Sequence, residues 1–229
     1  MRLYERLRLA GIGIALAAVM AAVLGWYAVH WTPDRARYPL QGIDASADNG
    51  AIDWLMVRAR GADFAYVRAT RGAGQRDARF AENWAALGDA QLPHGAVHVF
   101  SLCDDARAQA ANFVRTVPRD ADALPAAVAF DFAQGCDARP DRADVLARVQ
   151  LFLRLAEHHS GKPMLLRVSR SFEKRYGLTR ALDRPAWVVR PFFAPDYTAQ
   201  HWRMWRASSF RRIDGVSGLV HWDVIADDR

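Results

Sequence analysis

A single carboxylate interrupts one of the most apolar stretches of the chain. Residues 124–132 read LPAAVAFDF, in which Asp131 is the only charged residue. Such a short apolar run is typical of a buried strand. A buried charge is costly unless it is paired or used, so Asp131 is either a satisfied structural acid or a group that transfers protons.

Other side chains capable of chemistry stand at or just beyond the ends of similar runs. They are Asp44, Arg71, Cys103, Arg190 and His221. Carboxylates and imidazoles can move protons, and arginine can bind a carboxylate or a phosphate. Their value for function depends on whether the fold brings them together.

Short apolar runs alternate with helical patterns from residue 42 onward. Strands are predicted at 42–45, 64–69, 95–100, 127–132, 164–168, 187–192, 203–207 and 220–225. Helices are predicted at 51–60, 79–90, 105–117 and 142–158. Strands that alternate with helices pair in parallel, and strands buried on both faces require helices outside them.

This pattern predicts an α/β fold, an irregular TIM-like (β/α) barrel whose later helices are shortened or missing. In such barrels the chemistry lies at the carboxyl ends of the strands. The barrel therefore places the strand-end residues on one rim, which favours a functional role for Asp131 over a purely structural one.

One N-terminal transmembrane helix is predicted to precede the barrel. Residues 9–29 carry no charge and are closed by Trp26, Tyr27 and Trp31, which is long enough for a bilayer and typical of its interfaces. A cleavable signal is the alternative, but the run is long for one and lacks a convincing small-residue cleavage site. We therefore expect an uncleaved signal anchor.

The arginines among residues 1–8 predict a cytoplasmic N-terminus, although Arg35 and Arg37 on the far side weaken that signal. Residues 30–41, which contain two prolines, are predicted to be a tether. The domain at 42–229 would then face the periplasm or outside of a bacterial-type inner membrane.

The net charge of +6 is compatible with an anionic envelope polymer as partner, but also with an ordinary solvated surface. The chain has no basic-aromatic motif for nucleic acid, no zinc-ligand spacing and no glycine-rich phosphate loop. No nucleic-acid partner, metal or cofactor is expected.

Several motifs resemble, in order and spacing, those of glycoside hydrolase family 25 lysozymes, the Chalaropsis-type muramidases. The resemblance covers residues 42–225 and implies a barrel with a glycan cleft that acts on peptidoglycan. The motifs are GIDASADNG at 42–50, FAYVRATRG at 64–72, LPHGAVHVF at 92–100, LPAAVAFDF at 124–132 and WVVR at 187–190.

The resemblance also assigns the catalytic residues. The fourth strand in that family ends in Asp-x-Glu, with the Glu as general acid and the Asp assisting, and residues i and i+2 of a strand share a face. Here the positions read Ala129 and Asp131. Asp131 is thus the expected acid, shorter by one methylene, and Asp44 the supporting carboxylate. A withdrawal of about 1 Å can cost about 100-fold in rate.

Further departures weaken the expected activity. The family's Glu after the second strand is Arg71, its late Asp is His221, and a Tyr on the fifth strand is Arg167. Nearby cations, including His221 if it is charged, favour the ionised form of an acid. The sequence thus predicts a weakened muramidase-type hydrolase or, alternatively, a pseudoenzyme that binds cell-wall glycan or a partner protein.

Substrate contacts are expected from Arg71, His98, Arg190, Trp205 and His221. Each has a plainer interpretation. His98 fits a core histidine and His221 a rim histidine without chemistry, Trp205 fits a core or wall residue, and Arg190 fits a structural ion pair.

Two cysteines, Cys103 and Cys136, complete the candidates. Spacing alone does not separate a buried free pair from a disulfide. The barrel places the loops after its third and fourth strands side by side, and an exported domain can keep a disulfide. We therefore predict a Cys103–Cys136 bridge that frames Asp131.

Overall fold

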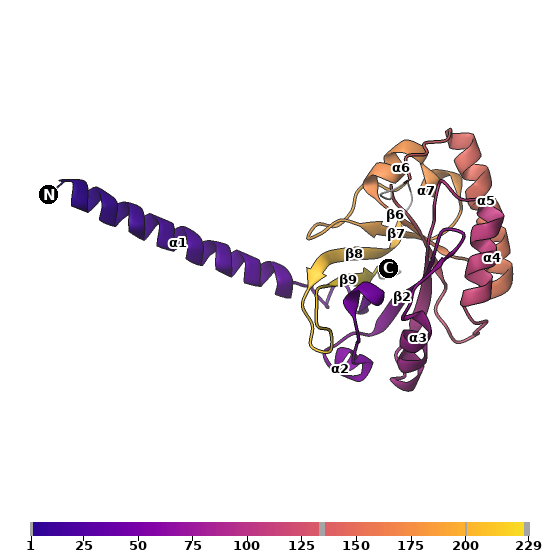
Figure 1. Ribbon diagram of the computed structural model, residues 1–229, viewed down its shortest axis with the longest axis horizontal. Helices are drawn as coiled ribbons and strands as arrows, with labels where there is room; N and C mark the ends of the chain where they lie inside the picture. The colour runs from indigo at the N-terminus through magenta and orange to yellow at the C-terminus, as the bar shows by residue number, and fades with distance from the viewer. Residues whose placement is uncertain (1, 133–135, 200, 227–229) are drawn as a thin grey trace.

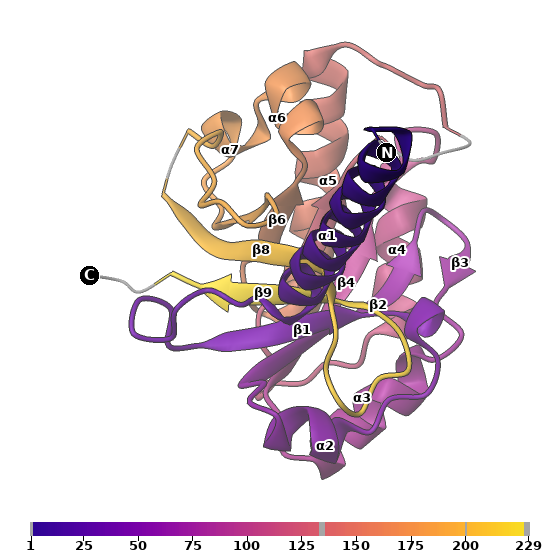
Figure 2. The same cartoon turned by 90° about the vertical axis from the view of Figure 1, so that its left-hand side faces the viewer.

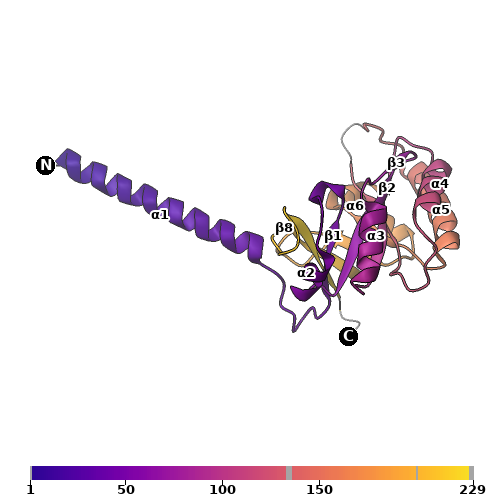
Figure 3. The same cartoon turned by 60° about the horizontal axis from the view of Figure 1, so that its bottom comes forward.

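The computed structural model describes residues 2–132, 136–199 and 201–226. Helix α1 (Arg2–His30) projects from a rounded body formed by the rest of the chain (Figures 1 and 3). Within α1, Leu7–His30 has a mean hydropathy of 2.2 and no buried residues, so it is apolar and long enough to cross a membrane. A signal sequence would have the same properties.

An eight-stranded barrel forms the centre of the body and confirms the predicted fold class. The strand order is β1-β9-β8-β7-β6-β5-β4-β2, and β1 closes the barrel by pairing with β2. The strands are β1 (Gln41–Ala45), β2 (Phe64–Arg71), β4 (His94–Val99), β5 (Ala127–Phe130), β6 (Leu165–Val168), β7 (Ala186–Val189), β8 (Trp202–Arg211) and β9 (Val220–Ile225). A short additional strand, β3 (Gln75–Arg76), pairs with β2 outside the barrel.

The direction of β9 differs from the parallel pairing expected for the whole sheet. β9 runs antiparallel to both β8 and β1, whereas the other neighbours in the barrel are parallel. The connection at 212–219 is short and contains no helix, and a parallel connection needs a longer crossover. The start of β9 therefore meets the carboxyl ends of its neighbours, and His221 lies opposite Asp44 in the register.

Helices lie outside the barrel, some above it and some below it in the view of Figure 2. The four predicted helices are present, and two short helices that the sequence did not predict follow β6, consistent with shortened later helices. The helices are α2 (Trp54–Ala59), α3 (Phe80–Asp89), α4 (Ala106–Thr116), α5 (Arg142–Ser160), α6 (Arg170–Tyr176) and α7 (Leu178–Ala181), with a 3₁₀ turn at Ala47–Asn49.

Side chains alternate between two apolar cores along each strand. On β5, Val128 and Phe130 pack outward in the core shared with the helices, whereas Ala127 and Ala129 belong to the core inside the barrel. This alternation follows from the two-residue period of a strand. Position 131 continues the inward-facing series at the mouth of the barrel.

The carboxyl end of α1 is fastened to the body. The carbonyl of Val29 accepts hydrogen bonds from the backbone of Arg212, at 2.8 Å, and from Arg211 Nη1, at 3.2 Å. The ring of Trp31 lies 5.2 Å from that of Phe192. The end of α1 and the start of the predicted tether thus contact the end of β8 and the segment that follows β7.

Candidate active site

A pocket of about 260 Å³ opens at the carboxyl ends of the barrel strands. It brings together four of the predicted site residues, which come from distant parts of the sequence: Asp44, Arg71, Asp131 and His221. Arg167 from β6 lines the same pocket. The pocket thus contains both carboxylates predicted to act together.

Asp44 is held rigidly at this pocket. Its Oδ2 accepts hydrogen bonds from Arg167 Nη1, at 2.6 Å, and from the guanidinium of Arg206. Its Oδ1 lies 3.2 Å from His221 Nδ1. Asp44 is also buried. The positive charges of Arg167 and Arg206 compensate its negative charge, and their hydrogen bonds fix its orientation. The carboxylate of Asp44 is therefore held in place and is not free to act as a base.

The two arginines that hold Asp44 point into the barrel from β6 and β8. Burial lowers the pKa of Arg167 to about 10, while Asp223 and Asp131 act in the opposite direction. Burial likewise lowers the pKa of Arg206. The centre of the Arg167 guanidinium lies 4.8 Å from the centre of the Trp187 ring, a contact that favours its charged form.

Asp223 on β9 is a functional candidate that the sequence analysis missed. It is fully buried, accepts a hydrogen bond from Trp187 Nε1 at 2.8 Å, and its Oδ1 lies 3.9 Å from Arg206 Nε. Burial raises its pKa to about 6, although both arginines oppose that shift. Its signal was its position two residues after His221, which puts both side chains on one face of the strand.

Burial favours the neutral form of the His221 imidazole, so His221 does not join the nearby cations. Burial, together with the positive charges of Arg206 and Arg167, lowers the pKa of His221 to about 2. A neutral ring protonated at Nδ1 donates to Asp44. His221 thus helps to hold the carboxylate of Asp44 and adds no charge to the pocket.

Asp131 is an accessible acid of the pocket, as is Asp48. It follows β5, is exposed, and accepts a 2.8 Å hydrogen bond from the backbone N–H of Phe132. Among the described residues no ion pair engages its carboxylate, whereas Asp48, which lines the same pocket, is paired with Arg68 at 3.0 Å. Asp131 can therefore approach a ligand without breaking an existing ion pair.

Three predicted substrate contacts lie outside this pocket. His98 is fully buried, and its ring nitrogens lie 2.7 Å from Thr70 Oγ1 and 3.2 Å from Gln109 Oε1. Trp205 is buried and donates to the carbonyl of Arg190 at 2.7 Å. Arg190 itself pairs with Asp196 at 3.1 Å. These contacts fit the structural interpretations of the three residues, and we propose no substrate contact for them.

The buried imidazole of His98 predicts a pH effect on stability. Burial lowers its pKa from 6.5 to about 4, so the unfolded chain binds a proton before the folded protein does, and stability falls as the pH drops through that window. The full contribution is about 3 kcal/mol. In urea unfolding of the full-length protein in detergent, His98→Gln should be costly at pH 7 and much less so at pH 4.

Comparison with wild type at each pH is essential to this measurement. The raised pKa of Asp223 has the opposite effect between pH 3.8 and about 6, because there the folded protein binds the proton first. Both proteins share that contribution. A destabilisation by His98→Gln that does not vary with pH would contradict the assignment of His98 as a buried neutral base.

Comparison with known proteins agrees with the barrel and its pocket. The model of the family described as "Glycosyl hydrolases family 25" matches residues 43–216, a segment that contains Asp44, Arg71 and Asp131. The chain belongs to this family. The resemblance found in the sequence motifs is thereby confirmed.

Solved structures support the same family 25 fold. A family 25 glycosyl hydrolase from Bacillus anthracis superposes with a TM-score of 0.79 and 25% identity, over 87% of this chain and 94% of the other. A bacterial lysozyme from Streptomyces coelicolor gives a TM-score of 0.72 at 24% identity, over 81% of this chain and 91% of the other. The second likeness is one of fold.

Sequence relatives of this family 25 chain include two bacterial proteins. The uncharacterized Escherichia coli protein YegX is 29% identical over 195 residues, which cover 82% of this chain and 70% of YegX. Lysozyme M1 of Streptomyces globisporus is 41% identical over 59 residues, only 26% of this chain and 20% of the lysozyme.

Ala129 is the position at which the motif resemblance leads us to expect an assisting acid. It lies in the inner core and is the register partner of Arg167 on β6. No carboxylate stands beside Arg167 at position 129, and its guanidinium reaches Asp44 instead. Arg167 thus pairs with Asp44 and has no acid beside it at position 129.

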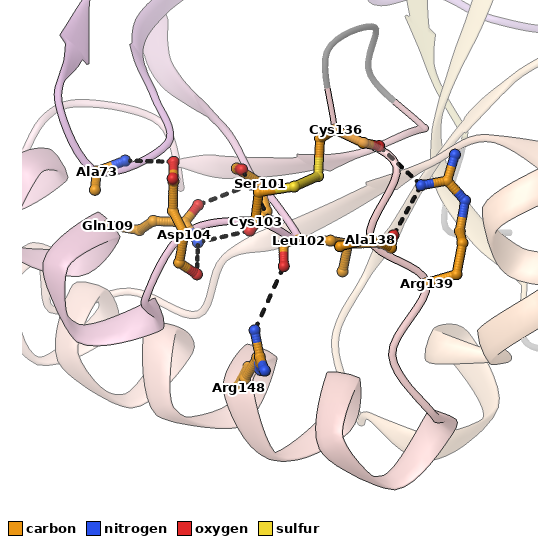
Figure 4. Close-up of a disulfide and its surroundings, with 10 residues drawn as sticks. All are labelled: Ala73, Ser101, Leu102, Cys103, Asp104, Gln109, Cys136, Ala138, Arg139 and Arg148. Atoms are coloured by element: carbon orange, nitrogen blue, oxygen red, sulfur yellow. Dashed lines mark hydrogen bonds between the residues drawn. A yellow bond between two sulfur atoms is a disulfide. The ribbon is translucent and has the colours of Figure 1, made fainter.

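The predicted disulfide joins Cys103 and Cys136 across two adjacent rim loops (Figure 4). Their Cα atoms are 5.9 Å apart. Nearby, Asp104 accepts a 3.0 Å hydrogen bond from the backbone N–H of Ala73. Both cysteines line a hollow of about 360 Å³ that shares Arg71 with the pocket. The bridge thus fixes one wall beside the candidate site.

Removing this bridge should lower stability measurably. The cysteines are 33 residues apart in sequence, and a loop of that size predicts a loss of about 3–4 kcal/mol in Cys103→Ser/Cys136→Ser. Urea unfolding of the full-length protein in detergent measures this loss. Reduced wild type should match the variant, and equal stability of the variant and oxidised wild type would contradict the prediction.

Proposed function

We propose that this family 25 protein is a membrane-anchored glycoside hydrolase of the N-acetylmuramidase type that acts on peptidoglycan, with Asp131 as its proton donor. The observation that carries this proposal is the position of Asp131. It is an exposed carboxylate without an ion pair among the described residues, in a rim pocket that also contains the fixed Asp44. The similarity to a Streptomyces lysozyme supports the choice of substrate.

The arrangement assigns different tasks to the two carboxylates. Cleavage of a glycosidic bond needs a proton for the leaving oxygen and a group that stabilises the oxocarbenium-like centre. Asp131 supplies the proton in its protonated form. Asp44 is engaged by Arg167 and Arg206, so it does not attack the sugar. The acetamido group of the substrate then stabilises the anomeric carbon, and Arg71 lines the pocket as a substrate contact.

Binding without cleavage is the second candidate, and a specific observation favours it. Both oxygens of Asp44 are engaged, and Ala129 contributes no carboxylate next to Asp131. An acid without an assisting neighbour is a weaker proton donor for this reaction. In this alternative the pocket holds the glycan strand as a non-catalytic receptor.

Membrane attachment through α1 completes the proposal. The apolar helix is uncovered along its length, and its carboxyl end is fixed to the barrel through Val29. The arginines before it favour a cytoplasmic N-terminus. The barrel would then lie outside the inner membrane, where a Cys103–Cys136 disulfide can persist.

Two measurements on the full-length protein in detergent separate the candidates. The first is the release of reducing ends from purified peptidoglycan, and the second is co-sedimentation with insoluble peptidoglycan. Release of muramic-acid reducing ends supports hydrolysis. Saturable co-sedimentation without new reducing ends favours the receptor, and the absence of both results rejects peptidoglycan as the ligand. Resistance of the protein to alkaline extraction from membranes tests the anchor.

A further inference from the structure

A second, larger cavity of about 830 Å³ lies on the same side of the barrel. Its walls come from the start of α5, from α6 and α7, and from the connection after β7. These segments follow the carboxyl ends of β5, β6 and β7, and Figures 1 and 2 show α6 and α7 together at one end of the body. The lining residues differ entirely from those of the Asp131 pocket.

This cavity is strongly basic. Its lining contains Arg142, Arg170, Lys174, Arg175 and Arg180. Of these, only Arg170 forms an ion pair within the described residues, with Asp196. The side chains of Lys174 and Arg180 are exposed, and neither forms a hydrogen bond or an ion pair with any residue that the structure describes. The cavity therefore presents positive charges that the protein itself does not neutralise.

The acids of the cavity do not compensate this charge. Glu173 is buried, and it accepts a 2.6 Å hydrogen bond from Thr179 Oγ1. Asp196 is shared between Arg170 and Arg190. Both carboxylates are thus already engaged, whereas guanidinium groups bind the planar, two-oxygen face of a ligand carboxylate well.

The basic cavity also adjoins the candidate catalytic acid. Phe132 lines the Asp131 pocket, and the centre of its ring lies 6.2 Å from that of Tyr176, which lines the cavity. A polymer bound at Asp131 can therefore extend a side branch into the cavity.

We propose that this cavity binds the carboxylates of the peptide branches carried by the glycan strand. The inference builds on the proposed function, because it treats the cavity as a second subsite for the same polymer. A neutral sugar chain makes no use of unpaired cations. A peptide branch with several free carboxylates matches both their charge and the guanidinium geometry.

The test measures binding of the purified tetrapeptide stem of peptidoglycan to full-length protein in detergent by calorimetry. Lys174→Gln/Arg180→Gln removes two charges that hold nothing in the described fold, and it should weaken binding by about tenfold. Arg107→Gln/Arg115→Gln removes two exposed charges from α4 as the matched control and should bind like wild type. The same tetrapeptide with its carboxylates amidated should not bind.

Three results would overturn the inference. The first is an equal loss in both double variants, which would indicate unspecific attraction. The second is that the tetrapeptide does not bind. The third is that inorganic tripolyphosphate binds through Lys174 and Arg180 whereas the tetrapeptide does not. Asp131→Asn should bind the tetrapeptide normally, so a failure of hydrolysis leaves this result unaffected.

Discussion

Replacing Asp131 by Asn should lower the release of reducing ends from peptidoglycan by about 10²–10⁴-fold, the usual contribution of a general acid. Asn has nearly the same shape but cannot donate a carboxylic proton to the leaving oxygen. Its side-chain oxygen can still accept the hydrogen bond from the backbone of Phe132. Folding and glycan binding should therefore remain close to those of the wild type.

Asp48 provides the matched control for this experiment. It lines the same pocket, but Ser46 and Arg68 already engage its carboxylate. Asp48→Asn should consequently keep most of the turnover. Equal turnover in Asp131→Asn and wild type would remove Asp131 from its assigned role, and unfolding midpoints of both variants show whether any loss reflects instability.

Much of the fold follows from periodicity that can be seen in the sequence. The alternation of short apolar runs with amphipathic segments predicted both the strands of the barrel and the helices outside it. Helix α5 shows why the helices were predictable. Its apolar positions include Val145, Val149 and Phe152, all buried, and it ends at Ser160, followed by Gly161 with a left-handed backbone of φ 72°. Local patterns of this kind survive because packing and local preference agree.

The polar interior of the barrel could not be predicted in the same way. The sequence shows Arg167 and Arg206 only as charges within strands, and nothing local indicates that both reach Asp44. Their meeting depends on the closure of the barrel. The antiparallel direction of β9, which places Asp223 next to Arg206, is likewise set by pairing between distant strands.

The prediction of ligand-contacting residues from the sequence had a similar limit. His98 and Trp205 occur on strands where a ligand contact was plausible, but the strand period alone does not say which face is the inner one. In the structure His98 faces α4 and α5, where its ring lies 4.6 Å from that of Phe152. The sequence placed Asp131 near the end of a strand predicted at 127–132, and the strand in the structure ends at Phe130, so Asp131 lies just beyond it.

The interior charge cluster predicts the largest effect on stability. Arg206→Met removes a buried arginine from a cluster in which Asp44 and Asp223 supply the negative charges. Removing one partner of a buried ion pair typically costs about 3–5 kcal/mol, because the remaining charge is left without compensation. Urea unfolding of the full-length protein in detergent at pH 7 measures this cost.

The pH dependence of that cost identifies the uncompensated group. The pKa of Asp223 is already raised to about 6 in the presence of Arg206, and loss of the arginine raises it further. Since the folded protein then binds a proton that the unfolded chain lacks, both wild type and Arg206→Met should lose stability as the pH rises from 3.8 to about 6, and only Arg206→Met should continue to lose it above pH 6. Arg206→Met/Asp223→Asn, in which the amide still accepts from Trp187, should abolish this slope. A slope that persists in the double variant would mean that Asp44, not Asp223, is the charge that Arg206 compensates.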